Sequence, residues 1–554
     1  MKQFFAAIAS LCLSACAPAQ LAPAPPAGSV PEMSLETLKV ITKTLSRDDF
    51  GGRAPGSAGE EKTLSYLVQA FDNVGLEPGN RGGWFQDVPL AEITAKKVSP
   101  LTVSGGSEVL DFAFGSEFIG GTYRLVPQID IAGSELVFVG YGIHAPEKGW
   151  NDYSGLDMRG KTAVILVNDP DYQSEGVDGR FNGRAMTYYG RWTYKYAEAA
   201  RQGADAALII HDTFPAGYGW NVVESSGKGP QAFAASGDGN AGETKFNGWI
   251  KKQVAARMLS AAGQDLAALS AAAKQPGFKP VPLGLKADLS VSNTLRTFNT
   301  KNVIGMLRGR NRPDEYVIYT AHWDHLGHCA ADEADTICNG AIDNASGIAG
   351  LVALADAFKR GGAPDRSVLF LAVGAEESGL LGSQYYAANP VFPLAQTVGG
   401  LNMDSLSLAG RARDVRVIGE GKSQLDSYLA EALKAVGRYQ TPDATPEKGF
   451  YYRSDHFSFA KRGVPMLFVD YGLDLVAGGR KAGEAYFSNY NANIYHSPRD
   501  EFSESWDWSG AMDDLTLYYL VGRSLAQSKA WPNWYEGDEF RAIRDASCAG
   551  AGGC

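Results

Sequence analysis

Hydrophobic positions along the chain follow helical and strand-like periods from about residue 34 onwards. In "TLSYLVQAFDNVGLEPG" apolar residues recur every three or four positions, as on one face of a helix, and Gly75 suits the end of that helix. Residues 85–121 show a shorter period with many turn residues, which predicts strands. Between about residues 128 and 285, "SELVFVGYGI" and "KTAVILVND" predict strands, and "YAEAARQGADAALIIHD" predicts a helix followed by a strand.

From Asn302 the pattern becomes a regular alternation of strands and helices. Strands are predicted at "YVIYTA", "SVLFLAV", "TVGGLNM" and "VPMLFVD". The segment "NASGIAGLVALADAFKRGG" predicts a helix that ends at Gly361. Its apolar face consists of Ile348, Leu351, Val352, Ala355 and Phe358. Strands that alternate with helices predict an α/β fold, with a mostly parallel, mixed sheet flanked by helices.

Composition narrows the function without changing this fold class. The 554 residues are 45% hydrophobic and 20% charged, as in ordinary globular proteins, and this length suggests roughly two to four domains. The net charge is −11, from 51 basic and 62 acidic residues. This balance argues against a general nucleic-acid-binding protein, which would normally carry a basic patch.

The first residues predict a targeting segment. Lys2 precedes an apolar run that is too short to span a bilayer as a helix. The following "LSAC" resembles the bacterial lipobox, in which the cysteine, here Cys16, is lipidated; ordinary signal-peptidase cleavage nearby is the alternative. The Ala/Pro-rich residues 17–33 predict an extended tether. We therefore expect an exported protein, either secreted or a periplasmic or outer-membrane lipoprotein that touches the membrane only through Cys16.

Four cysteines follow this segment as two close pairs, Cys329/Cys338 and Cys548/Cys554. Export favours disulfides, so we predict two local bridges. Metal binding by the first pair is the alternative, but its neighbourhood lacks a second pair of thiolates.

Imidazoles and carboxylates follow the predicted strands of the second half. Because ligands in such sheets lie beyond the carboxyl ends of the strands, these side chains are expected to meet. Taken singly, each has an ordinary explanation as a helix N-cap or a structural histidine. The residues are His322, Asp343, Glu376, Glu377, Asp404 and His496.

Two histidines and several carboxylates without thiolates suit zinc in a hydrolytic site, with ligands at ~2.0–2.2 Å. Five ligands that share one carboxylate suit two metal ions better than one, because a bridging carboxylate holds the ions ~3.5–4 Å apart. The sequence therefore predicts a two-metal hydrolytic site.

This set of residues resembles the co-catalytic di-zinc exopeptidases, a family of bacterial aminopeptidases, glutamate carboxypeptidases and glutaminyl cyclases. The resemblance runs from "FGGRAPGSAGEEK" to "YHSPRDEF" and covers most of the mature chain. The members most similar to it carry a protease-associated domain, and "GYGI", "GLDMRGKTAVILV" and "AARQGADAALII" resemble that module.

The resemblance implies a zinc exopeptidase fold with a smaller inserted α/β protease-associated domain. The expected division is a signal peptide at 1–16, a tether at 17–33, the first part of the peptidase domain at 34–125, the insert at 126–290, the zinc peptidase domain at 291–545 and a C-terminal tail at 546–554.

The family's metal ligands correspond to five residues of this chain. The resemblance implies one zinc ion held by His322, Asp343 and Asp404, and a second held by Asp343, Glu377 and His496. Asp343 would bridge the two ions.

Three further expectations accompany these ligands. Glu376 would be the general base. Asp324 would orient the imidazole of His322, because ligating histidines commonly need such a partner. The Asp343–Asn344 peptide bond is a candidate for the cis form found in the family.

A tyrosine is expected to stabilise the oxyanion. Its spacing to the Ser-Asp-His of "GFYYRSDHFSF" favours Tyr451, and Tyr495 is the alternative; either one could instead be a packed core tyrosine. We interpret His325 and His328 as loop residues, because the ligand set is complete without them. Asp455 and His456 are interpreted as structural.

The predicted function is a metal-dependent exopeptidase that hydrolyses the N-terminal bond of peptides by a two-zinc activated water. A glutamate carboxypeptidase-like enzyme is the first alternative and would hold a substrate carboxylate with arginines. The candidates are Arg453, Arg411, Arg413 and Arg416. A glutaminyl cyclase, for which the insert is not typical, and an inactive receptor-like binding protein, which would usually lack ligands, are the remaining alternatives.

Overall fold

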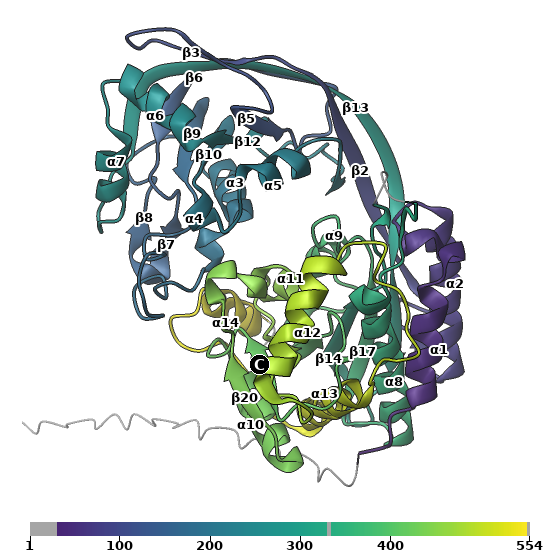
Figure 1. The fold of residues 1–554 in the computed structure, drawn as a ribbon. Helices are drawn as coiled ribbons and strands as arrows, with labels where there is room; N and C mark the ends of the chain where they lie inside the picture. The colour runs from purple at the N-terminus through teal and green to yellow at the C-terminus, as the bar shows by residue number, and fades with distance from the viewer. Residues whose placement is uncertain (1–29, 330–333, 551–554) are drawn as a thin grey trace, which may run out of the picture.

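The computed structural model describes residues 30–329 and 334–550 and has two lobes (Figure 1). Two long antiparallel strands, β2 (Phe85–Val98) and β13 (Val281–Leu307), run from one lobe into the other. The predicted signal peptide, Cys16 and most of the tether lie outside the described residues, as does Cys554 of the second predicted disulfide.

The larger lobe is built on a mixed sheet in which the strands lie in the order β13–β17–β14–β18–β21–β19–β20. The neighbours β17, β14, β18 and β21 run parallel, whereas β13 is antiparallel to β17 and β19 is antiparallel to β21. The predicted mixed sheet is confirmed. The strands span Arg312–His322 (β14), Arg366–Val373 (β17), Thr397–Asn402 (β18), Asp414–Ile418 (β19), Tyr439–Pro442 (β20) and Met466–Asp470 (β21).

Side chains of β14 alternate between two hydrophobic cores, as expected of a strand buried on both faces. Val317 and Tyr319 pack in the core that α1, α8 and α13 share, whereas Ile318 packs in the core that includes α9 and α11. The helices of this lobe span Leu35–Leu45 (α1), Ala58–Asn73 (α2), Gly347–Arg360 (α8), Leu381–Ala388 (α9), Leu425–Val436 (α10), His456–Ala460 (α11), Gly479–Asn493 (α12), Ser509–Gln527 (α13) and Arg541–Gly550 (α14).

The central helix of this core is also the most apolar one. The helical segment Ala341–Arg360 is long and apolar enough to cross a membrane, but 94% of its most apolar window is buried inside the protein. It is therefore a core helix, and it ends at Gly361 as predicted. The last residues of the predicted tether also join this core, since Met33 is buried there.

The smaller lobe has its own sheet, in the order β13–β6–β9–β10–β12–β5, in which β6, β9, β10 and β12 are parallel. The strands span Leu101–Ser104 (β3), Leu110–Phe112 (β4), Phe118–Gly121 (β5), Gln128–Phe138 (β6), Lys161–Leu166 (β9), Ala206–His211 (β10), Pro230–Ala234 (β11) and Phe246–Lys251 (β12). The helices span Trp192–Arg201 (α3), Thr213–Ala216 (α4), Trp220–Ser226 (α5), Lys252–Ala261 (α6) and Leu266–Ala273 (α7).

The cores of the two lobes divide the chain near residue 99 rather than at the expected residue 126. Leu101, Phe112 and Phe118 pack with Phe138 in the core of the smaller lobe. Strands β3 to β5 therefore belong to that lobe. At the other end the division lies within β13, whose Val291 packs in the smaller lobe and whose Val303 packs in the larger one.

Candidate active site

The predicted site residues meet at the carboxyl ends of the parallel strands. His322 is the last residue of β14, Glu376 and Glu377 follow β17, and Asp404 follows β18. Asp343 lies in the helical turn Ala341–Ser346 that precedes α8. His496 lies in the loop after α12 and has φ of 57°, in the left-handed region.

The two carboxylate oxygens of Asp343 face two different histidines. Oδ1 lies 3.2 Å from His322 Nε2, and Oδ2 lies 3.2 Å from His496 Nε2. His322 Nε2 is also 3.2 Å from Asp404 Oδ1, and His496 Nε2 is 3.1 Å from Glu377 Oε2. The five residues therefore form two groups that share Asp343.

This donor set fits two metal ions. Donor atoms bound at ~2.1 Å to a tetrahedral zinc ion lie about 3.4 Å from one another, close to the separations within each group. The carboxylates of Asp343, Glu377 and Asp404 are also packed together with that of Glu376, which lies within the same group as His322. So many negative charges at short range repel one another unless cations lie between them.

The charges in the site shift the pKa values of its members strongly. Burial by itself would lower the pKa of His322, but Glu376, Asp343 and Asp404 raise it well above its ordinary value. Burial would raise the pKa of Asp343, but His322 and His496 hold it well below its ordinary value. For Glu376 burial dominates, and Asp404 and Glu377 add to it, so its pKa is raised. A carboxyl group with a raised pKa suits a proton acceptor and donor.

Asp324 contacts the residues that follow β17 and lies beside His322 at the end of β14. Its Oδ1 accepts a hydrogen bond from the backbone N–H of Glu376 at 3.1 Å, and its Oδ2 accepts one from the N–H of Glu377 at 3.3 Å. His322 Nδ1 lies 3.1 Å from the backbone oxygen of Asp324 and 3.8 Å from its carboxylate. Asp324 thus lies beside His322, as predicted, and also holds the turn that carries the two glutamates.

Two buried residues that support the site were not identified from the sequence. The carboxylate of Asp500 accepts hydrogen bonds from the N–H groups of Ile342 at 2.9 Å and Asp343 at 3.0 Å. Arg53 is fully buried and donates to the backbone oxygens of Trp323, at 2.8 Å, and Gly340, at 2.9 Å. They lie in the motifs "FGGRAPGS" and "SPRDEF", but their contacts join segments that are more than 150 residues apart in the sequence. The Asp343–Asn344 bond is cis, which confirms that expectation.

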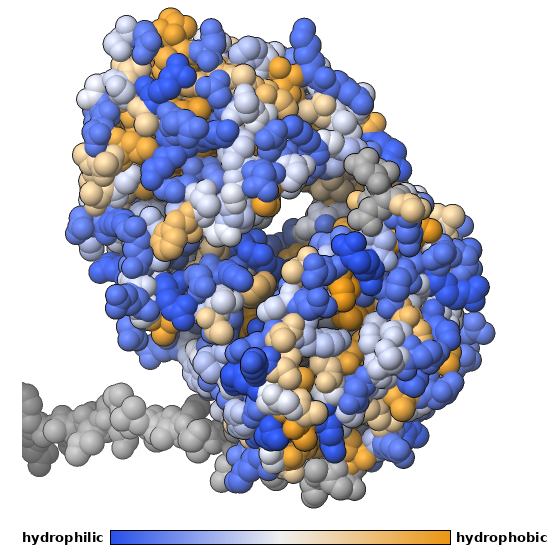
Figure 2. Space-filling model, viewed as in Figure 1, coloured by the Kyte–Doolittle hydropathy of each residue, from blue (hydrophilic) through white to orange (hydrophobic). Residues whose placement is uncertain are grey.

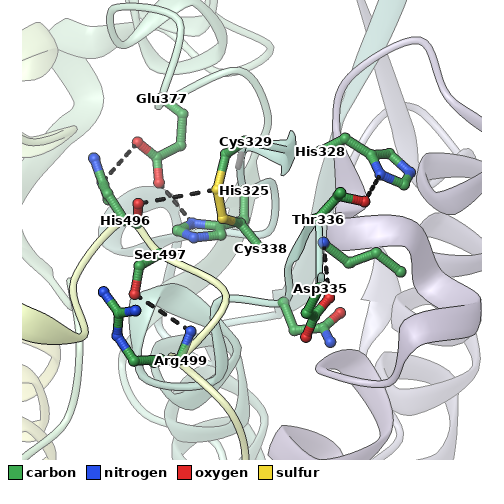
Figure 3. Close-up of a disulfide and its surroundings, with 12 residues drawn as sticks. His325, His328, Cys329, Asp335, Thr336, Cys338, Glu377, His496, Ser497 and Arg499 are labelled. Atoms are coloured by element: carbon green, nitrogen blue, oxygen red, sulfur yellow. Dashed lines mark hydrogen bonds and ion pairs between the residues drawn. A yellow bond between two sulfur atoms is a disulfide. The ribbon is translucent and has the colours of Figure 1, made fainter. Parts of the chain in front are cut away.

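His325 lies inside the site rather than outside it. It is a loop residue, as interpreted, but it is fully buried and its Nδ1 is 2.7 Å from Glu377 Oε1 (Figure 3). His328 is exposed and pairs with Thr336 Oγ1 at 2.9 Å.

The predicted disulfide between Cys329 and Cys338 is present beside this histidine (Figure 3). Its Cα atoms are 5.9 Å apart, and Cys329 Sγ lies 3.9 Å from the backbone oxygen of His496. The bridge therefore joins the segment after His325, which contacts the backbone of His496, to the strand Ile337–Cys338.

The two candidate tyrosines lie in different surroundings. Tyr451 is 6% exposed, packs against His456 and does not line the cleft that contains the metal-ligand candidates. Tyr495 does line that cleft and stacks on the imidazole of His496, with ring centroids 3.8 Å apart. Tyr495 is 46% exposed; partial desolvation, and then the carboxylates of Asp343 and Glu377, raise the pKa of its hydroxyl above the ordinary value, so the hydroxyl keeps its proton. The geometry favours Tyr495, the alternative, over Tyr451.

The smaller lobe covers one side of this cleft. The cleft has a volume of about 550 Å³. Its walls include Tyr188, Trp192 and Phe233 from the smaller lobe, opposite Glu376 and Asp404. Figure 2 shows the hollow between the two lobes.

Two arginines also line the cleft, Arg191 at the start of α3 and Arg453. Burial, and then the charge of Arg453, lower the pKa of Arg191 to about 10. Arg191 Nε is buried without a hydrogen-bond partner, and within residues 30–329 and 334–550 no ion pair joins either guanidinium to a carboxylate. By contrast, Arg411, Arg413 and Arg416 pair with aspartates elsewhere.

Comparison with known proteins relates the larger lobe to a peptidase family. Residues 302–520, which contain all five ligand candidates and Glu376, match Peptidase family M28. The matched segment forms most of the larger lobe, which is therefore similar to the peptidases of that family.

Curated relatives are similar over part of the chain. Aminopeptidase NAALADL1 of Rattus norvegicus is 31% identical over 269 residues, which are 47% of this chain and 30% of that protein. A glutamate carboxypeptidase 2 homolog of Caenorhabditis elegans is 34% identical over 137 residues, which are 24% of this chain and 16% of that protein. The chain thus spans less than a third of the length of these relatives.

Solved structures with similar folds include two bacterial enzymes. An aminopeptidase from Aneurinibacillus sp. strain AM-1 has a TM-score of 0.45 at 21% identity, over 90% of this chain and 96% of that one. BSAP, a zinc aminopeptidase from Bacillus subtilis, has a TM-score of 0.43 at 18% identity, over 92% of this chain and 99% of that one.

Proposed function

We propose that the protein is a two-zinc exopeptidase that hydrolyses the terminal bond of peptides. One observation carries this proposal: the two carboxylate oxygens of Asp343 face two separate histidine–carboxylate pairs. A single metal ion would use only one of these groups. His322 and Asp404 would hold one ion and His496 and Glu377 the other, with Asp343 between them.

Zinc ions bound there would supply a water of lowered pKa and polarise the scissile carbonyl. Glu376 is placed to take a proton from the attacking water as the new C–O bond forms. When the C–N bond breaks, the same proton passes from Glu376 to the leaving amine. The Tyr495 hydroxyl, protonated and in the cleft, donates a hydrogen bond to the oxyanion.

Removal of the N-terminal residue is the activity that we propose first. The carboxylates of Glu376 and Asp404 on the cleft wall favour a substrate ammonium group. The curated relative with the longer matched segment quoted above is named as an aminopeptidase. Peptides are the proposed partners.

A carboxypeptidase is the second candidate, and Arg191 and Arg453 favour it. Two guanidinium groups without carboxylate partners in one cleft would attract a substrate carboxylate. Other relatives are named as glutamate carboxypeptidases.

A substrate panel separates the two candidates. The zinc-loaded protein should hydrolyse peptides with a free N-terminus and spare N-acetylated ones, and a chelator should abolish turnover. Hydrolysis of N-acetylated dipeptides, lost on amidation of their C-terminus, would establish the carboxypeptidase instead.

Paired substitutions test the division of labour between the two glutamates. Glu376→Gln should lower kcat by at least 100-fold and retain both zinc ions, whereas Glu377→Gln should lose zinc. Near-normal turnover of Glu376→Gln would contradict the assigned base.

Two further expectations remain proposals. The smaller lobe is proposed to be a protease-associated domain, on the strength of "GYGI" and its neighbours. Export with a lipid on Cys16 is proposed on the strength of "LSAC".

A further inference from the structure

A second cavity, of about 490 Å³, opens beside the cleft and is lined mostly by the smaller lobe. The two share part of their walls, including Tyr123, Trp192, Phe233 and Gly379, so the cavity is continuous with the site. Gly379 follows the candidate base Glu376 by three residues. The cavity is therefore reachable by a side chain of a substrate bound at the metal site.

The walls of this cavity are rich in aromatic rings. Six aromatic side chains line it: Tyr123, Trp192, Tyr196, Tyr218, Phe233 and Trp249. Neighbouring rings contact one another at edges and tilted faces, with centroid distances of 4.4 Å for Tyr123 and Phe233 and 5.6 Å for Trp192 and Tyr196. Aromatic rings favour such edge and offset contacts with a further ring.

Three buried polar atoms of residues that line this cavity have no hydrogen-bond partner, and one of them is Arg191 Nε. Asn247 is 2% exposed, and its Nδ2 donor makes no hydrogen bond, nor does the Oδ1 acceptor of Asn293. Both residues line the cavity. Buried polar groups are normally paired, so an unpaired donor and acceptor at a cavity wall indicate a ligand that supplies the missing partners.

We propose that this cavity is a specificity subsite that binds an aromatic side chain of the substrate residue next to the scissile bond. The proposal rests on the exopeptidase function proposed above and names its substrate class. Tyrosine and tryptophan suit the site best, because their rings pack against the aromatic wall and their O–H or N–H pairs with an asparagine amide. Peptides with alanine at that position would leave the cavity and its polar atoms unfilled.

Gly121 allows the cavity to be filled without disturbing the fold. This residue ends β5 and lines the cavity, and a Cβ atom placed on it would meet no other atom within 4 Å. Its φ lies outside the left-handed region, so a larger side chain is not strained there. The series Gly121→Ala, Gly121→Val and Gly121→Phe should therefore fill the cavity progressively.

Gly237 provides a matched control. A Cβ atom on Gly237 also meets open space, and its backbone is equally permissive. Gly237 borders a groove between the lobes that shares no lining residue with the aromatic cavity. The same three substitutions at Gly237 should leave substrate preference unchanged.

The experiment compares kcat/KM for Tyr-Ala, Ala-Tyr and Ala-Ala peptides. In the unaltered enzyme one of the tyrosine peptides should exceed Ala-Ala by about 10- to 100-fold. Gly121→Phe should abolish that preference, whereas Gly237→Phe should retain it. Hydrolysis without a tyrosine preference, or with one that survives Gly121→Phe, would overturn the subsite and leave the exopeptidase function standing.

If no peptide is hydrolysed, peptide binding tests the subsite instead. Calorimetry of Tyr-Ala and Ala-Tyr with the zinc-loaded Glu376→Gln protein measures the subsite without turnover. If one peptide binds and Gly121→Phe lowers its affinity at least tenfold, the subsite is supported even if the proposed reaction fails. The subsite would be overturned if neither peptide binds, or if the peptides bind equally well to the Glu376→Gln protein with and without Gly121→Phe.

Discussion

Replacement of Asp500 by asparagine should loosen Asp343 without removing any metal ligand. The Asp500 carboxylate is fully buried and receives the N–H groups of Ile342 and Asp343 on its two separate oxygens. Asparagine has nearly the same shape but only one acceptor oxygen. One of the two N–H groups would then face an NH₂ donor.

The cost can be estimated from these contacts. A hydrogen bond to a charged group contributes about 1.5–3 kcal/mol, and a buried donor left without a partner costs a similar amount. Asp500→Asn should therefore lower the free energy of unfolding by about 2–4 kcal/mol. Because Asp343 lies between both candidate metal positions, zinc affinity should also fall by about 10- to 100-fold, as for other residues that orient ligands.

Two measurements separate these effects. Urea unfolding of the chelator-treated protein gives the change in stability, and competition with a chromophoric chelator gives the change in zinc affinity. Asp157→Asn is the matched control, because Asp157 is exposed and pairs with Arg159 at the surface, so stability should change by less than about 1 kcal/mol. If Asp500→Asn retains zinc affinity within threefold and behaves like the control in urea, our account of Asp500 is wrong.

Further predictions concern Lys422, His325 and Cys16. Lys422 is largely buried and pairs with Asp538 at 2.7 Å and Glu539 at 3.0 Å, so Lys422→Met should cost about 3–5 kcal/mol in urea unfolding. Burial would lower the pKa of Lys422, but Glu539 and Asp538 raise it. The stability that Lys422 contributes is therefore complete below about pH 10 and is lost as the pH rises further. Urea unfolding at pH 8 and pH 11 should show this loss of stability in the unaltered protein and not in Lys422→Met. His325→Gln should lower the affinity for one zinc ion by about 10-fold, and two equal, unchanged sites in a titration would contradict this prediction. Cys16→Ala should release the expressed protein from the membrane fraction, and unchanged fractionation would exclude the lipid anchor.

The larger lobe was predictable because its strands are buried on both faces. A strand such as β17, buried along its whole length, appears in the sequence as an unbroken apolar run between turn residues. The lobe boundary was not predictable in the same way. Residues 294–297 of β13 are exposed and show no alternation of burial, so the sequence there carries no signal that one strand continues from lobe to lobe.

The site was predictable to the extent that each residue directly follows a strand. His322, Glu376, Glu377 and Asp404 were found by that rule, whereas Asp500 acts on backbone N–H groups more than 150 residues away. Nothing in the sequence around a hydrogen-bond acceptor indicates which distant N–H group it will meet. For the same reason the sequence could not decide between the two candidate tyrosines. Only the fold shows that Tyr495 lines the cleft and that Tyr451 packs against His456.

The adjacent carboxylates of Glu376 and Glu377 show how one turn can separate two roles. Ala375, just before them, has φ of 55°, and Asp324 holds the N–H groups of both glutamates. With the backbone fixed in this way, the side chains diverge: Glu377 lies against the imidazoles of His325 and His496, and Glu376 lies on the His322 side. Glu377 therefore has an imidazole on either side, whereas the carboxylate of Glu376 lines the cleft and makes no hydrogen bond or ion pair within the described residues. A carboxylate held near the substrate but uncommitted to a neighbour is the one that can exchange protons, and for that reason the two substitutions to glutamine should differ in outcome.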